Sequence, residues 1–217
     1  LEPSTVTEAK ELTVYAFALS AELKLPVLLR TTTRINHSSS TITLGAMQQR
    51  LTQGFFEKNP FAYVCIPAVS RNLHPKLLEM YNRAAEQSNR SVWNRIEGAG
   101  RWGVVCNGVS YGYVIDAIRE LGQAESFRVL RVGFSHPFPE TMTLSFLKGC
   151  DKVLVVEEGE PYLEEAVRNS AQKVGLTLEV QGKGEGLFSR LYEFNPALVK
   201  QVIAEFFGLP FQAYQPI

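Results

Sequence analysis

The sequence predicts an α/β fold with three layers, in which amphipathic helices cover both faces of a parallel sheet. From residue 101 onward, short runs rich in Val and Leu alternate with stretches that carry apolar residues at helical spacing. Strand–helix pairs of this kind join into right-handed βαβ units. Glycines that can end a helix follow three of the stretches, at Gly122, Gly149 and Gly208. The predicted strands are 102–106, 127–132, 153–156 and 176–180, and the predicted helices are 109–121, 139–147, 161–173 and 196–207.

The N-terminal region predicts one helix followed by one strand. Thr5 and Glu8 have the spacing of a capping box, and the apolar residues that follow recur at helical spacing as far as Lys24. Pro26 ends this helix, and residues 26–30 predict a short buried strand. One helix and one strand cannot bury their apolar faces alone. We therefore expect this unit to be the last part of a domain that begins earlier in a longer chain.

The segment between these two regions predicts one more strand and one more helix. A polar run without helical period, residues 31–43, leads into it. Residues 61–66 are apolar and predict a strand. Residues 72–87 predict a helix with Asn72 as its cap and Pro75 in its first turn, where the missing N–H costs little.

Composition and charge exclude several classes of function. The 22 Lys and Arg residues balance 22 Asp and Glu residues, so the chain lacks the basic surface that neutralises nucleic-acid phosphates. No apolar run approaches the roughly twenty residues of a membrane span, and the first residues lack the pattern of a signal peptide. We therefore expect no nucleic acid and no membrane among the partners, and a cytoplasmic location.

The cysteines and histidines do not predict a metal site. Cys65, Cys106 and Cys150 lie far apart in or beside apolar runs, and no CxxC pair exists, which argues against a zinc site or an iron–sulfur cluster built from this chain. We expect them to be reduced, buried thiols. His37 lies beside Ser38, but neighbours in a loop do not hold the geometry of a catalytic triad. The loop from Arg34 to His37 is left without a role.

The turn at residues 107–112 is the one weak candidate for a binding site. It joins a predicted strand to a predicted helix, and in α/β folds ligands, anions above all, bind at such helix N-termini. Asn107, Gly108 and Ser110 are the candidate residues for an anion. The turn is neither GxGxxG nor a Walker motif. The simpler interpretation is that Asn107 caps the helix and Gly108 permits the tight turn.

Five carboxylates surround the predicted helix start at residues 157–165. Crowded carboxylates can raise a pKa and supply a general acid, but negative charge at a helix N-terminus is also simply favourable. We predict a capped, solvated helix start. Glu157 differs from the others because it ends an apolar strand, and it is expected to point into a domain interface.

Several separated motifs resemble one family, in the same order along the chain. Residues 25–38 resemble the end of the pyrimidine-binding domain in the large subunit of indolepyruvate:ferredoxin oxidoreductases. Residues 107–111 and 133–139 are similar to the domain that follows, which resembles transketolase C-terminal domains. Residues 155–164 and 182–184 continue the similarity, and a divergent patch lies near 41–59.

The resemblance implies an enzyme that converts arylpyruvates and coenzyme A into aryl-acetyl-CoA, carbon dioxide and reduced ferredoxin. Thiamine diphosphate, Mg²⁺ and [4Fe-4S] clusters would carry that chemistry in the full-length enzyme. The family's activating glutamate, Gly-Asp-Gly motif and cysteine-rich segment have no counterpart in this sequence. No catalytic residue, cofactor or metal site is therefore carried over. The implied partners are other domains of the same subunit, a smaller second subunit and ferredoxin.

Two functions from different classes follow. In the first, residues 1–44 end a pyrimidine-binding-like domain, 45–100 connect, and 101–217 form a transketolase C-terminal-like α/β domain. The whole is then a structural, interface-forming piece of the oxidoreductase, predicted to be inactive alone and able to pair with a second copy. The alternative is a stand-alone α/β module that binds a nucleotide or another anion at residues 107–112.

Overall fold

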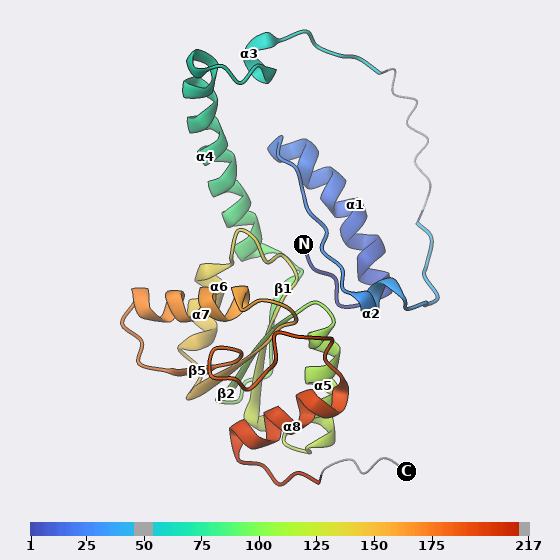
Figure 1. Ribbon diagram of the computed structural model, residues 1–217, viewed down its shortest axis with the longest axis vertical. Coiled ribbons are helices and arrows are strands. Elements are labelled where there is room, and N and C mark those ends of the chain that lie inside the picture. The colour runs from blue at the N-terminus through green and yellow to red at the C-terminus, as the bar shows by residue number, and fades with distance from the viewer. Residues whose placement is uncertain (46–53, 213–217) are drawn as a thin grey trace.

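The computed structural model describes residues 1–45 and 54–212, and its centre is a three-layer α/β domain (Figure 1). Predictions that fall on residues 46–53 and 213–217, including part of the divergent patch, lie outside the described residues. Two helices cover each face of a five-stranded sheet. The α/β class is therefore confirmed.

The sheet is mixed, which corrects the prediction of a purely parallel sheet. Its strand order is β1-β3-β2-β4-β5. The neighbouring pairs β3–β2, β2–β4 and β4–β5 are parallel, whereas β1 pairs antiparallel with β3. The strands are β1 (Asn94–Glu97), β2 (Trp102–Asn107), β3 (Phe127–Val132), β4 (Lys152–Val156) and β5 (Glu179–Gln181). β1 was not predicted because its sequence, Asn-Arg-Ile-Glu, is polar and short, as an edge strand can be.

The helices around the sheet agree closely with their predictions. They are α5 (Ser110–Glu120), α6 (Glu140–Leu147), α7 (Tyr162–Lys173) and α8 (Pro196–Phe207), and a short 3₁₀ helix, η1 (Ala124–Ser126), precedes β3. Asn195 caps α8 by accepting from Leu198 N, and Gly208 ends it in the left-handed conformation. Only β5 is clearly shorter than predicted, since residues 176–178 lie outside it.

Alternate residues of the central strands face opposite layers of the core. Val104, Val129 and Leu154 pack under α5 and α8, whereas Val105 and Leu130 pack under α6 and α7. Such strands are buried on both faces, which is the reason that they read as continuous apolar runs.

The N-terminal unit folds back onto this domain. Helix α1 (Val6–Leu23) begins at Thr5, whose hydroxyl accepts from Glu8 N as predicted. Its buried face, with Leu12, Leu19 and Leu23, forms a separate apolar cluster with Ala84 and Phe134. Residues 26–30 are extended but pair in no sheet, so the strand predicted there is wrong. A one-turn helix, α2 (Thr33–Asn36), follows.

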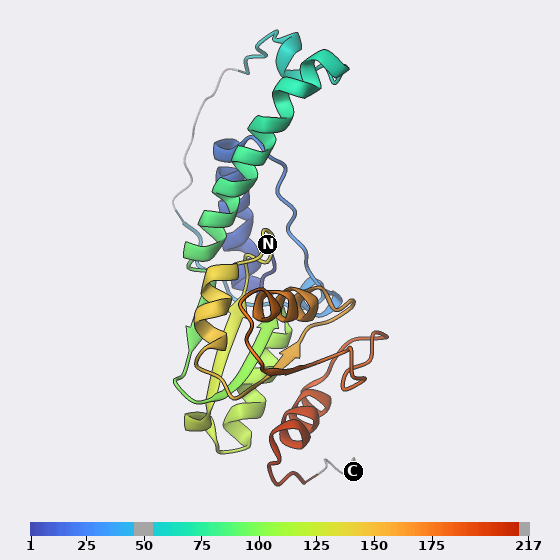
Figure 2. The same cartoon turned by 90° about the vertical axis from the view of Figure 1, so that its left-hand side faces the viewer.

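The segment before β1 forms an arm that stands away from the sheet (Figures 1 and 2). It consists of α3 (Pro60–Tyr63) and the long helix α4 (Pro67–Arg90). The strand predicted at 61–66 is wrong, because α3 begins at Pro60, a residue favoured in the first turn of a helix. The predicted helix is longer than expected, so Pro75 lies inside it and Asn72 is not its cap. The last turns of α4 are anchored to the body, where Ser88 Oγ donates to Phe134 O at 2.9 Å.

Candidate functional site

The carboxyl ends of β2, β3 and β4 meet at one edge of the sheet, the edge at which α/β folds commonly bind ligands. The predicted turn after β2 lies there, with Gly133 after β3 and Glu157 and Glu158 after β4. The segment around Glu2 lies across this edge, because Glu2 N donates to Gly133 O at 2.7 Å. The structure therefore places the chain's own N-terminal residues at this edge of the sheet.

Asn107 and Glu2 form a buried hydrogen bond at the centre of this edge. Asn107 Nδ2 donates to Glu2 Oε2 at 3.1 Å. The same carboxylate oxygen accepts from Arg30 Nη1 at 2.5 Å, and Arg30 Nη2 donates to Glu158 O at 3.2 Å. Both Glu2 and Asn107 are buried. An anionic group thus lies at the predicted turn, and it is a side chain of the same molecule.

Asn107 does not cap α5, which corrects the simpler interpretation of the turn. Helix α5 begins at Ser110 without a side-chain cap, since the Asn107 amide is directed to Glu2 instead. Gly108 has φ +50°, so the expectation that it permits a tight turn is confirmed, and a Cβ there would lie 3.8 Å from Pro3 O. Ser110 is 1% exposed, and its hydroxyl has no hydrogen-bond partner among the described residues.

A second ion pair joins α1 to the sheet. Arg131 of β3 pairs with Glu8 of α1, and the side chain of Arg131 is 3% exposed. The Arg131 guanidinium also lies 4.7 Å from the centre of the Tyr111 ring. Glu8 accepts from Ser4 N at 2.9 Å as well. Buried charges need such pairing, so α1 is held at a fixed position.

The carboxylates at the start of α7 are partly buried, which corrects the prediction that they are solvated. Glu157 accepts from Leu163 N and Glu164 N, each at 2.8 Å. It therefore caps α7 and does not point into a domain interface. Burial raises the pKa of Glu157 to about 7, although the two backbone N–H groups and Lys183 act in the opposite direction. Glu164 is also buried and accepts from Lys183 N at 2.6 Å.

Lys183 is a buried cation. Residues 182–184 belong to a motif of the resemblance, but the sequence predicted no role for Lys183. Its Nζ donates to Ser189 O at 2.8 Å and lies 4.4 Å from the centre of the Phe194 ring. Burial lowers the pKa of Lys183, against the opposing charge of Glu157. Phe194 N in turn donates to Glu158 Oε1 at 2.9 Å. These contacts of Lys183 and Phe194 hold residues 182–194 against the edge of the sheet at which β4 ends.

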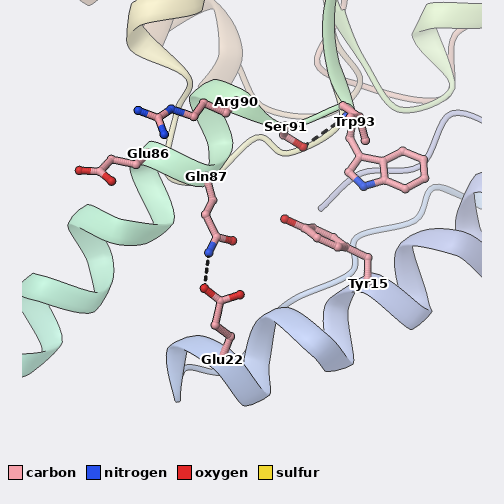
Figure 3. A pocket seen from close by; sticks show the side chains of 8 residues that line it. Tyr15, Glu22, Glu86, Gln87, Arg90, Ser91 and Trp93 are labelled. Carbon is pink, nitrogen blue, oxygen red and sulfur yellow. Dashed lines mark hydrogen bonds between the residues drawn. The ribbon is translucent and has the colours of Figure 1, made fainter.

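Two hollows flank the contact between α1 and α4. One, of about 500 Å³, is bordered by Tyr15 and Glu22 of α1 and by the end of α4 through Trp93. Figure 3 shows Glu22 facing Gln87, which donates to it at 2.7 Å. The other, of about 430 Å³, is apolar and extends from Leu19 to Tyr81. Within the described residues neither hollow brings together a nucleophile and a base.

The remaining candidates lie apart from this edge. Cys65 is exposed, which corrects the prediction that all three thiols are buried, whereas Cys106 and Cys150 are buried. Burial raises the pKa of the Cys150 thiol to about 11. Ser38 donates to Arg34 O at 2.6 Å, not to a histidine. Over residues 1–45 and 54–212 no three His, Cys, Asp or Glu side chains are grouped so that they could hold a metal ion. Among the described helices none is both long and apolar enough to cross a bilayer.

Together these features define an α/β domain that binds its own N-terminal segment at the sheet edge where this fold commonly binds a ligand. Six curated relatives, 35–39% identical over nearly all of the chain, are each named indolepyruvate oxidoreductase subunit IorA. The protein from Methanothermobacter thermautotrophicus is 38% identical over 213 residues, which are 97% of this chain. This confirms the resemblance to the large subunit of indolepyruvate:ferredoxin oxidoreductases.

The chain spans about a third of the length of these relatives, 34% for the Methanothermobacter protein. Two solved structures are also similar. A 2-oxoglutarate:ferredoxin oxidoreductase from Magnetococcus marinus is 17% identical with a TM-score of 0.44, over 65% of this chain and 24% of its own. A split-gene transketolase is 20% identical with a TM-score of 0.38, over 53% of this chain and 38% of its own. A scan against models of protein families finds no match.

Proposed function

We propose that this chain is a structural, interface-forming part of a thiamine-diphosphate-dependent 2-oxoacid:ferredoxin oxidoreductase. The whole enzyme oxidatively decarboxylates indolepyruvate or a related arylpyruvate, with coenzyme A, to the aryl-acetyl-CoA and passes the electrons to ferredoxin. The similarity to IorA proteins over 97% of the chain supports this assignment. Within that enzyme residues 1–44 end one domain, and residues 101–217 form the next.

The observation that carries the structural role is the buried contact of Glu2 with Asn107 and Arg30. It joins the N-terminal unit to the α/β domain through charged groups that are costly to bury unless they are paired. The ion pair between Arg131 of β3 and Glu8 of α1 is a second charged contact between the N-terminal unit and the α/β domain. A rigid joint between two domains is the function that this geometry serves.

The residues present do not fit the cofactors of the whole enzyme. A [4Fe-4S] cluster takes four cysteine thiolates, whereas the sequence has three cysteines, of which Cys106 and Cys150 are buried and Cys65 is on the surface. The Gly-Asp-Gly motif that the resemblance implies for the diphosphate and Mg²⁺ has no counterpart in this sequence. Thiamine diphosphate, Mg²⁺ and the clusters are therefore assigned to other parts of the enzyme, and the role proposed for this chain includes no step of the reaction.

The proposed partners are the other domains of the same subunit, a smaller second subunit and ferredoxin. The relatives are themselves named as subunits, which supports more than one kind of chain in the assembly. The buried thiols of Cys106 and Cys150 fit a reducing compartment such as the cytoplasm.

The filled turn argues against the stand-alone anion-binding module. A free phosphate at Asn107 would have to displace the Glu2 carboxylate and leave Arg30 without its partner. The two functions are separated by titrating the 217-residue chain, by calorimetry, with Mg²⁺–thiamine diphosphate and, separately, with inorganic pyrophosphate. The structural role predicts no saturable heat with either compound. A micromolar site for pyrophosphate would support the binding module, and one for thiamine diphosphate would place the cofactor in this chain.

A further inference from the structure

Residues 182–194, called the strap below, are held in different ways at their two ends. The first end is fixed by the α/β domain itself. The buried carboxylate of Glu164 accepts from Lys183 N at 2.6 Å and from Gly184 N at 3.1 Å. A Cβ on Gly182 or Gly184 would lie 2.6 or 2.9 Å from a Glu164 oxygen, so only glycine permits this close approach. The first end of the strap is therefore a fixed point.

The last residues of the strap are held by the turn that follows β4. Glu158 Oε1 accepts from Phe194 N at 2.9 Å, and Glu160 pairs with Arg190. Phe194 is buried, and a buried N–H group that loses its acceptor is costly. The second end of the strap therefore depends on the position of the turn at residues 158–160.

The N-terminal unit holds the same turn from its other side. Arg30 Nη2 donates to Glu158 O at 3.2 Å, while Nη1 of the same guanidinium donates to the Glu2 carboxylate at 2.5 Å. Gly159 has φ +80°, and a Cβ there would lie 3.4 Å from Arg30 Nη2. Glycine thus suits the turn and leaves room for the guanidinium. Arg30 connects the carboxylate of Glu2 to the turn that holds the strap.

A second cation of the N-terminal unit contacts the strap directly. Arg34 Nη2 lies 3.3 Å from Glu193 Oε2, but both side chains are about half exposed. Exposed ion pairs contribute little to stability. The side chain of Glu2, in contrast, is only 11% exposed, so Arg30 is held more firmly than Arg34. We therefore assign the larger effect to Arg30 and a smaller one to Arg34.

The strap covers a buried cation at the edge of the sheet. Lys183 Nζ donates to Ser189 O at 2.8 Å and lies 4.4 Å from the centre of the Phe194 ring. Both partners belong to the part of the strap that follows its fixed end. If Phe194 moves away, the Lys183 cation loses the ring that covers it. The position of the second end therefore decides whether this cation is covered.

We propose that the strap is hinged: Glu164 fixes its first end, and Arg30 latches its second end through the turn at Glu158, so that movement of the N-terminal unit uncovers Lys183. The proposal goes beyond the structural role proposed above, because it gives the joint between domains an effect on a segment of the α/β domain. It rests on that joint for the position of Arg30.

Amide-resolved hydrogen exchange of the 217-residue chain, measured by NMR, tests the latch. Rates are compared with those of the β2 and β4 amides, so that a general loss of stability cancels. In Arg30→Gln the relative exchange rate at Phe194 is expected to rise about tenfold or more, as loss of a hydrogen bond from a charged group allows. The relative rates at Lys183 and Gly184 are expected to stay at their wild-type values, because Glu164 still holds these two amides.

Two further variants make the result specific. Arg83→Gln is the matched control, because the side chain of Arg83 is 47% exposed against 49% for Arg30, and its ion-pair partner is Glu22 of α1. This control is expected to leave the rate at Phe194 unchanged. Arg34→Gln is expected to raise the rate about threefold, as loss of a weak exposed pair does. It provides a second reading if Arg30→Gln does not fold.

Three results would overturn the proposal. The first is an unchanged relative rate at Phe194 in Arg30→Gln, or in Arg34→Gln if only that variant folds. The second is an equal rise at Phe194 and Lys183, which would mean that the strap has no fixed end. The third is the same rise in Arg83→Gln. The joint itself is tested separately by Asn107→Asp, so a destabilised Asn107→Asp together with an unchanged Phe194 amide would remove the latch and leave the joint.

Discussion

The side-chain amide of Asn107 donates to the carboxylate of Glu2 across 3.1 Å, although 105 residues separate the two in the sequence. The bond lies where β2 ends and α5 begins, the position at which an α/β fold commonly binds an anion. Arg30 pairs with the same carboxylate and so joins a third part of the chain to the contact. The positive end of α5 and the Arg30 cation together receive a carboxylate of the same molecule.

Replacement of Asn107 by Asp tests this contact. Asn107→Asp puts a second carboxylate beside Glu2 and removes the donor, so the free energy of unfolding is expected to fall by about 2 kcal/mol, in the range for a buried polar group that loses its partner. Urea unfolding at pH 7 measures the difference. The double variant Glu2→Gln, Asn107→Asp restores an amide–carboxylate pair with the roles exchanged. The double variant is expected to recover part of the lost unfolding free energy. If its loss instead equals the sum of the losses of the two single variants, the two side chains do not interact.

Truncation of Leu154 tests the core of the sheet. Leu154 is fully buried in β4, between β2 and β5. Leu154→Ala is expected to cost about 2–5 kcal/mol of unfolding free energy, through lost burial and the cavity left behind. Chemical denaturation of the variant measures this cost. A loss below about 1 kcal/mol, well under the usual range, would contradict the central position of β4.

Glu157 gives the stability of the chain a pH dependence. Burial raises its pKa from 4.5 in the unfolded chain to about 7 in the folded one. The folded state therefore holds the proton more tightly. The stability that Glu157 contributes is fully present below about pH 4.5 and is lost as the pH rises through about 7. The difference is on the order of 3 kcal/mol, since one pKa unit is worth about 1.4 kcal/mol.

Substitution of Glu157 by Gln removes this titration. Unfolding free energies of the wild type and of Glu157→Gln, measured from pH 4.5 to pH 8, are expected to differ in slope, with the variant flatter. Glu157→Gln keeps one of the two acceptor oxygens that cap α7, so a constant offset between the curves is also expected. Glu11→Gln, at an exposed position on α1, is the control and should leave the slope unchanged. Parallel curves for wild type and Glu157→Gln would contradict the assignment.

Two glycines with opposite surroundings give a matched pair. A Cβ on Gly103 of β2 would lie 2.7 Å from Cys150 Sγ and 2.8 Å from Val153 Cγ2. Gly103→Ala is therefore expected to destabilise the chain by about 1–3 kcal/mol through overpacking. Gly112, inside α5, has open space at the same position. Gly112→Ala is expected to stabilise by about 0.5–1 kcal/mol, because alanine is the better helix former. Thermal unfolding measures whether Gly103→Ala lowers the stability and Gly112→Ala raises it. Equal changes in stability for the two variants would contradict the close packing around Gly103.

The α/β domain was predictable because its local signals agree with its tertiary structure. Val104 and Leu154 belong to continuous apolar runs, and such runs occur where both faces of a strand are covered. Helix α8 was predicted at 196–207, as the structure has it, because Pro196 and Gly208 are residues that favour the start and the end of a helix; the Asn195 cap was not predicted. Where the local sequence pattern and the burial of the residues agree, a single sequence is enough to predict the helix or strand.

The candidate site and the arm could not be predicted to the same extent. Glu2 has no local pattern that marks it, and only the folded chain brings it to Asn107. Glu164 was predicted to be solvated because its charge is visible in the sequence and its burial is not. The run at 61–66 is apolar like a strand, but in the structure it has no sheet to join and is exposed. Apolar sequence reports burial only when a partner surface exists.

The measurement that tests the proposed structural role most directly uses the complete oxidoreductase of which this chain is proposed to be a part. Asn107→Asp is introduced, and both the fraction of assembled enzyme and the turnover per assembled enzyme with indolepyruvate, coenzyme A and ferredoxin are measured. If the contact of Asn107 with Glu2 serves only to join domains, the assembled fraction falls while turnover per assembled enzyme stays at the wild-type value. Normal assembly with a loss of turnover would instead place Asn107 in the chemistry and contradict the account.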